Sequence, residues 1–283
     1  MSQPRRKRRK KRGVSFRPAP PYAYGETMER PSILLTNDDG IGAAFLHALA
    51  KACAIEGFRV WVAAPTGERS WIGRAFSRHR PVAVHETEGP GERAWKIDGT
   101  PSDCVNIALG HLLPAKPDVV LSGMNIGYNA SMPLGLSSGT LAGAIEGATW
   151  GIPAAACSLD LDQPIFETVH RASGTCPPAL EANLEAACRH AARFARELAG
   201  SEHRGITVHN LNYPATTHAA TAVERTVPAH LRFGTLFQPG ADGYVFRWND
   251  GEEQSGRQDT DVAALERGSI SHSVLDFSSV GHR

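Results

Sequence analysis

Short hydrophobic runs recur along the chain, and segments of helical or polar character separate them. The run Ile33-Leu34-Leu35 has the pattern of a strand buried on both faces of a sheet. After a polar turn, Ile41, Phe45 and Leu49 follow at helical spacing. The pattern predicts further strands at 59–64, 81–85, 94–98, 117–121, 153–158, 206–210 and 269–275, and helices beginning near Pro101 and Ser138 and covering 180–198 and 261–265. Strands that alternate with helices predict a doubly wound, mostly parallel α/β sheet.

The alternation changes between residues 217 and 249, where β-rich segments are separated by Gly and Pro turns. We interpret this stretch as a β-hairpin excursion of the kind often used for oligomer contacts. With this excursion, residues 31–283 are predicted to form a single α/β domain. Residues 1–30 are predicted to precede it as a disordered basic tail and a Pro-rich linker.

Composition narrows the class of protein. The chain has 283 residues, of which 41% are hydrophobic and 21% are charged, as in an ordinary globular protein. It contains no apolar run long enough to span a bilayer and no apolar segment after the first basic residues, so we expect a cytoplasmic protein without membrane contact. The five cysteines form no Cys-x-x-Cys pair, which favours reduced thiols over disulfides or a zinc site.

Eight consecutive basic residues at 5–12 dominate the charge pattern. They hide an acidic remainder, because the formal net charge is +1 for the whole chain and −7 without them. Such a run repels itself and favours disorder. It is either an anchor for RNA or another polyanion or a solvated tail, and we favour the solvated tail.

Oxygen-bearing side chains follow three of the predicted strands. Asp38 and Asp39 come after the first strand, Ser70 after the second and Asn125 after the strand at 117–121. Because ligands bind beyond the carboxyl ends of parallel strands, these oxygens are expected to meet around one hard cation such as Mg²⁺ or Mn²⁺. The set contains neither sulfur nor imidazole, which argues against zinc. The alternative for the Asp-Asp-Gly turn is a solvated turn or a helix N-cap.

A phosphate site is expected nearby. Ser138, Gly139 and Thr140 stand at a predicted helix start, where free backbone N–H groups and the helix dipole attract anions. The loop 125–129 adds amide donors. The alternative is a helix that is merely capped by Ser and Thr and follows a flexible loop.

Several motifs, in a fixed order, resemble those of the SurE survival-protein family, the 5′/3′-nucleotidases. These segments are Asn37-Asp38-Asp39-Gly40, Ala64-Pro65 with Arg69-Ser70, 99–105, 122–129, Ser138-Gly139-Thr140 with Glu146-Gly147, 210–214 and 260–271. The resemblance covers about residues 31 to 277. It implies a Rossmann-like core and a homodimer or homotetramer.

The resemblance also implies an activity, namely metal-dependent hydrolysis of nucleoside 5′/3′-monophosphates to nucleoside and phosphate through a metal-activated water. One Mg²⁺ or Mn²⁺ per subunit would be held by Asp38, Asp39, Ser70 and Asn125, and Asp38 and Asp39 would be the catalytic residues. Under the same hypothesis the phosphate would be bound by Asn37, Asn129, Ser138, Gly139 and Thr140.

Two departures from the family pattern lie beside the expected site. Trp71-Ile72 follows Ser70 where the family usually has Gly, and the stretch 130–137 lacks the usual Asp and Tyr. They motivate an alternative function, a non-catalytic nucleotide- or metal-binding SurE-like protein whose active-site loop has drifted.

Overall fold

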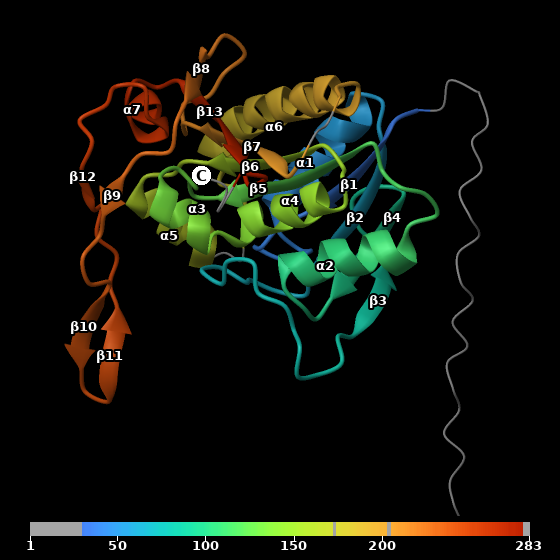
Figure 1. Cartoon of the computed structure of the whole chain (residues 1–283), viewed down its shortest axis with the longest axis horizontal. Helices are drawn as coiled ribbons and strands as arrows, with labels where there is room; N and C mark the ends of the chain where they lie inside the picture. The colour runs from blue at the N-terminus through green and yellow to red at the C-terminus, as the bar shows by residue number, and fades with distance from the viewer. Residues whose placement is uncertain (1–29, 172–173, 203–204, 280–283) are drawn as a thin grey trace, which may run out of the picture.

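The computed structural model describes residues 30–171, 174–202 and 205–279, and it is built around a nine-stranded sheet (Figure 1). The strand order is β3-β4-β2-β1-β5-β6-β7-β13-β8. The strands are β1 (Ser32–Thr36), β2 (Arg59–Pro65), β3 (Val84–Thr87), β4 (Arg93–Ile97), β5 (Val119–Ile126), β6 (Ala154–Leu159), β7 (Thr207–Tyr213), β8 (Val223–Thr226) and β13 (Ile270–Asp276). The basic run at 5–12 lies outside the described residues.

Strands β4, β2, β1, β5, β6 and β7 pair in parallel along the sheet. The chain thus moves outward from β1 in one direction and then, from β5, in the other. This is the order of a Rossmann-type sheet, in which the reversal between the two central strands opens a crevice. At one edge β3 pairs antiparallel with β4. Toward the other edge β13 pairs antiparallel with β7 and in parallel with the edge strand β8. The predicted Rossmann-like, mostly parallel sheet is confirmed.

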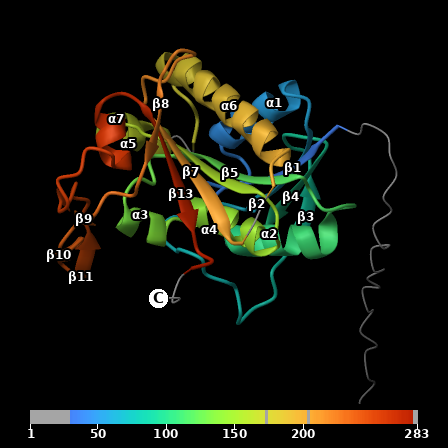
Figure 2. The same cartoon turned by 45° about the horizontal axis from the view of Figure 1, so that its top comes forward.

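Helices cover both faces of the sheet (Figures 1 and 2). α1 (Ala44–Ile55) and α6 (Pro178–Ala199) pack on one face, while α2 (Pro101–Ile107) and α4 (Gly139–Thr149) pack on the other. Side chains of β1 alternate between these layers, because successive residues of a strand point to opposite faces. Leu35 packs in the core beneath α1 and α6, and Leu34 packs in the core beneath α2 and α4.

Small residues let α4 lie close to the sheet. A Cβ atom on Gly147 would come within 2.7 Å of the side chain of Val120, and one on Gly143 would meet Thr36 at the same distance. The helix starts at the predicted place, because the hydroxyl of Ser138 accepts the N–H of Leu141. Thr100 caps α2 in the same way, and this helix begins at Pro101, as the sequence predicts.

Two short helices depart from the sequence prediction. The stretch expected to be a polar loop contains α3 (Met132–Ser137), and α5 (Gln163–Arg171) follows β6. Tertiary contacts hold α3, since the N–H of Ser131 donates to the carboxylate of Asp261 and the N–H of Met132 donates to the carbonyl of Ala229. A helix of so few residues leaves no clear hydrophobic periodicity in the sequence, so the pattern does not predict it.

The expected β-rich excursion is present. It contains β8, β9 (Leu231–Arg232), β10 (Phe237–Gly240) and β11 (Gly243–Phe246), of which β10 and β11 form an antiparallel hairpin that stands away from the main sheet (Figure 1). β12 (Glu252–Glu253) pairs with β9, and α7 (Asp261–Glu266) leads into β13. No helix among the described residues is long and apolar enough to cross a membrane.

Candidate active site

Three of the four predicted metal ligands meet at one cavity. Asp38 follows β1, Asn125 lies near the end of the adjacent strand β5, and Ser70 follows β2 on the other side of β1. All three line a cavity of about 740 Å³ at the reversal of strand order. The fourth, Asp39, is held beside it, because its carboxylate accepts the N–H of Ile126 at 3.3 Å.

The acidic turn is organised by Asn37. Its side-chain amide donates to the carbonyl of Gly40 at 3.0 Å, and its amide oxygen accepts the N–H of Gly40 at 3.2 Å. Asn37 is fully buried and is not among the residues that line the cavity. Its side chain therefore shapes the turn that presents the two aspartates.

The N-terminus of α4 is tied to Asp38. The hydroxyl of Thr140 donates to Oδ1 of Asp38 at 2.7 Å. Gly139 lies against the same side chain, and a Cβ atom there would be 2.8 Å from Oδ2 of Asp38, so this close approach requires glycine. Of the three residues predicted at this helix start, Ser138 lines the cavity, while Gly139 and Thr140 contact the aspartate.

Asn129 lines the cavity within a net of buried polar contacts. Its side-chain amide donates to the hydroxyl of Ser158 at 2.9 Å, and its N–H donates to the side-chain oxygen of Asn212 at 2.7 Å. Its carbonyl accepts from the amide of Asn210 at 3.0 Å. The segment 210–214 noted in the sequence thus secures the loop that follows β5.

Asn125 reaches the site through an irregularity in β5. The register between β5 and β6 shifts between Ser122 and Asn125. Gly123 is required there, because its φ is +135° and a Cβ atom would come within 2.2 Å of the carbonyl of Cys157. The side-chain NH₂ of Asn125 donates to the carbonyl of Gly127 at 2.6 Å, which leaves its oxygen as the atom available to a ligand.

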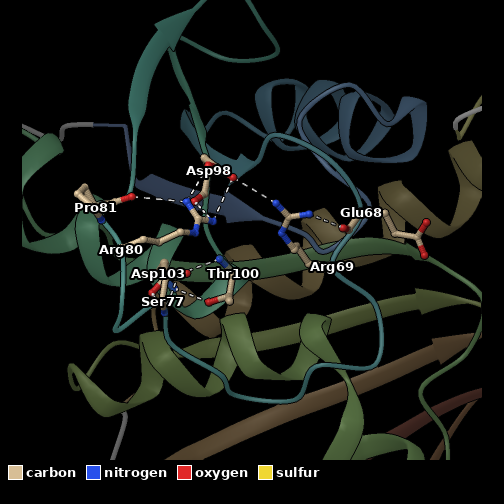
Figure 3. Close-up of polar contacts among 8 residues, drawn as sticks. All are labelled: Glu68, Arg69, Ser77, Arg80, Pro81, Asp98, Thr100 and Asp103. Carbon is tan, nitrogen blue, oxygen red and sulfur yellow. Dashed lines mark hydrogen bonds and ion pairs between the residues drawn. The ribbon is translucent and has the colours of Figure 1, made fainter.

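The loop that carries Ser70 is anchored on both sides (Figure 3). Asp98 accepts from the guanidinium groups of Arg69, at 3.3 Å, and Arg80, at 2.7 Å. Farther along the loop, the N–H of Ser77 donates to the carboxylate of Asp103 at 3.2 Å. The residues after β4 therefore fix the loop after β2, although the segment 99–105 does not line the cavity.

Glu68 orients the hydroxyl of Ser70. The hydroxyl donates to Oε1 of Glu68 at 2.8 Å, and Oε2 of Glu68 lies 2.8 Å from Nε2 of His170 in α5. Because the proton of Ser70 is directed to Glu68, the oxygen lone pairs of Ser70 remain for a ligand in the cavity. Glu68 and His170 act on the site through Ser70, as outer residues do around bound metals.

Two ionised aspartates at this place are costly unless a positive charge lies close to them. Burial raises the pKa of Asp38 from 3.8 to about 6, and burial together with the charge of Asp38 raises the pKa of Asp39 well above its ordinary value. In the parts of the chain that the structure describes, neither carboxylate forms an ion pair with a Lys, Arg or His. A divalent cation would compensate both charges.

The donor atoms fit a hard ion. Two carboxylates, a hydroxyl and an amide oxygen suit Mg²⁺ or Mn²⁺ and leave positions for water and substrate. Within the described ranges, no group of three or more His, Cys, Asp or Glu side chains is arranged to hold a metal. The oxygens of Ser70 and Asn125 would add to the aspartates as donors for such a cation.

Sequence reasoning missed the opposite wall of the cavity. Asp160 and Asp162 line it directly after β6, so the strand-end argument that selected Asp38 also applies to them. Burial and the charge of Asp162 raise the pKa of Asp160 to about 6. The other residues of this wall come from the loop after β5, from α5 and from the excursion, and no sequence signal marks them: Tyr128, Phe166, Phe246, Arg247, Trp248 and Asp250.

The substitution Asp38→Asn tests the electrostatic cost of the site. In metal-free protein the folded state binds more protons than the unfolded state between pH 3.8 and about 6, so the contribution of Asp38 to stability falls as the pH rises through this window. The amide of the variant carries no charge and does not have this cost. The free energy of unfolding of the variant, relative to that of the parent, should therefore increase by about 1–3 kcal/mol from about pH 4 to about pH 7. Urea unfolding with a chelator present measures the gain, and an equal difference at both pH values would contradict it.

Removing the carboxylate that orients Ser70 should weaken cation binding. In the variant Glu68→Ala the hydroxyl of Ser70 loses its acceptor, and we expect the affinity for Mn²⁺ to fall about 10- to 100-fold. Titration calorimetry measures the affinity. Glu88→Ala is a matched control, because Glu88 is exposed and lies outside the cavity lining. Equal affinities of the two variants would exclude a role for Glu68.

Known proteins are similar to this chain over most of its length. The model of the family described as "Survival protein SurE" matches residues 33–233. A protein named 5′-nucleotidase SurE from Pelotomaculum thermopropionicum is 34% identical over 262 residues, which cover 89% of this chain and 91% of the relative. A protein of the same name from Desulfovibrio desulfuricans is 34% identical over 256 residues, covering 89% of this chain and 95% of the relative.

A solved structure is also similar. The crystal structure of the SurE protein from Aquifex aeolicus matches with a TM-score of 0.66 and 26% sequence identity, and the match covers 87% of this chain and 93% of that chain. The family match spans more than half of the chain, and it includes the acidic turn, the loop of Ser70 and the segments around Asn125 and Ser138. This chain belongs to the SurE survival-protein family.

Proposed function

We propose that this protein is a metal-dependent nucleotidase that hydrolyses nucleoside 5′/3′-monophosphates to nucleoside and phosphate. The observation that carries the proposal is the cavity at the reversal of strand order. There the buried Asp38 and the partly buried Asp39 lie beside a helix N-terminus, and no basic side chain of the described residues pairs with them. Relatives named 5′-nucleotidase SurE, which share most of the chain, support the same reaction.

In this proposal Asp38, Asp39, Ser70 and Asn125 hold one Mg²⁺ or Mn²⁺. Such a cation supplies charge neutralisation at the phosphoryl oxygens and activation of water. Thr140 and the N–H of Ile126 each occupy one carboxylate oxygen of the aspartate pair and so fix its orientation. The remaining carboxylate oxygens are available to the cation or to the proton of the attacking water.

The phosphate of the substrate binds at the start of α4. Ser138 and Asn129 line the cavity there, and Gly139 brings the positive end of the helix dipole against Asp38. Donors held in this way stabilise the charge that develops on the phosphoryl group in the transition state. Asn37 contributes indirectly, by holding the turn of the two aspartates.

The altered stretch 130–137 favours catalysis over the non-catalytic alternative. It folds into α3, and Leu134 and Ser137 line the cavity without filling it. The half-exposed Trp71 also lines the cavity and leaves Asp38 in its lining. Trp71 and the stretch 130–137 thus change the lining of the cavity near Asp38 and leave Asp38 accessible to a substrate.

Phosphate release from AMP in the presence of Mg²⁺ or Mn²⁺ tests the reaction. Chelation should abolish it, and Asp39→Ala or Asn125→Ala should lower it by at least about 100-fold, because each change removes a group that stabilises the transition state. Glu88→Ala, at an exposed residue outside the cavity lining and outside the hairpin, is the control. A parent protein that binds AMP in a thermal-shift assay and releases no phosphate would favour the non-catalytic alternative.

We also propose that the protein forms a homo-oligomer through the hairpin of β10 and β11. Tyr244 is 76% exposed, and Phe237 and Val245 are 53% exposed each, on an element that stands away from the sheet (Figure 1). Apolar side chains gathered on a protruding hairpin favour contact with another chain.

Light scattering should give the parent a mass that is a multiple of that of one chain. Val245→Glu should lower this mass, because a charge on the apolar surface of the hairpin opposes its burial. A monomeric parent, or an unchanged assembly in the variant, would contradict the proposal.

A further inference from the structure

Trp71 occupies an unusual position for a large side chain. It follows Ser70 directly and lines the same cavity. Its φ is +60°, in the left-handed region that a residue with a side chain rarely adopts and that glycine adopts freely. The backbone conformation here is one that suits glycine, and this chain nevertheless places an indole at the cavity.

Aromatic side chains of the excursion hold the indole. The ring of Trp71 lies 5.3 Å from that of Phe246 and 6.0 Å from that of Trp248, both in edge-to-face geometry. Trp248 in turn lies 5.6 Å from Phe233. Trp71, Phe246 and Trp248, here called the aromatic wall, all line the cavity, and they join the loop of Ser70 to the excursion. The indole of Trp71 remains 47% exposed.

The surroundings of the aromatic wall indicate what it binds. Phe166 and Tyr128 add rings to the lining. Asp160, Asp162 and Asp250 line the same cavity and outnumber its cation Arg247, so the part of the cavity beyond the metal end disfavours additional phosphates. A substrate that fits both ends has one phosphate and a flat, uncharged aromatic group.

We propose that Trp71 stacks on the base of a nucleoside monophosphate and sets the preference of this protein for nucleotides over aliphatic phosphomonoesters. The inference rests on the proposed function. It assigns the indole of Trp71 to the base, which is the part of the substrate remote from the phosphate. Phe246 and Trp248 position the indole, and base–aromatic stacking tolerates different bases because every base has a π-face.

The test compares AMP with glycerol 2-phosphate, which carries the same phosphomonoester and no ring. In Trp71→Ala the ratio of kcat/KM for AMP to kcat/KM for glycerol 2-phosphate should fall about 5- to 140-fold, which is a stacking energy of about 1–3 kcal/mol per base converted at 1.4 kcal/mol per tenfold. The loss should lie mainly in KM for AMP. Trp71→Phe should retain most of the ratio.

Phe76→Ala is the matched control, because Phe76 is an exposed ring farther along the same loop and outside the cavity lining. It should leave the ratio unchanged. If Trp71→Ala lowers kcat/KM for both substrates by the same factor, the indole only supports the loop of Ser70 and the inference is overturned, while the proposed nucleotidase activity stands.

A binding measurement keeps the inference testable if the parent releases no phosphate. Calorimetric titration with AMP and Mg²⁺ should then show weaker binding to Trp71→Ala than to the parent and to Phe76→Ala. Equal affinities would overturn the inference. Absence of phosphate release from both substrates, with AMP binding that depends on Trp71, would instead refute the proposed function alone.

Discussion

The rest of this structure depends on two adjacent carboxylates, Asp38 and Asp39, held at the reversal of strand order. Burial makes their negative charge costly, and in the described part of the chain no basic side chain pairs with them. The fold keeps them there with Thr140 and the N–H of Ile126. Such an arrangement is more stable with protons or a cation on the pair than without them, which couples the stability of the fold to the chemistry of the site.

Elements that never touch the cavity account for much of its geometry. Asp98 and Asp103 fix the loop of Ser70, while Asn210 and Asn212 fix the loop of Asn129. Glycines allow the backbone to approach where a side chain would clash, as at Gly123 and Gly139. Motifs that lie far apart along the chain therefore have a common role. They hold the loops that follow the carboxyl ends of neighbouring strands.

The excursion contributes part of the lining of the cavity. Phe246 and Trp248 contact Trp71, which directly follows Ser70, and the three rings form the aromatic wall of the cavity. The stretch 130–137, which departs from the family pattern, contributes a neighbouring part of the lining through α3. The cavity is therefore lined both by loops that follow strands of the main sheet and by the excursion.

The sequence by itself determined the alternation of strands and helices, the acidic turn and the capped starts of α2 and α4, because hydrophobic periodicity and capping are local. Strand-end reasoning also selected Asp38, Ser70 and Asn125, since parallel strands must end at one edge. Only the tertiary structure decided that the side chain of Asn37 bonds within its own turn, that α3 is helical, and that Trp248 contacts Trp71. These outcomes depend on contacts between residues far apart in the chain, which no local pattern encodes.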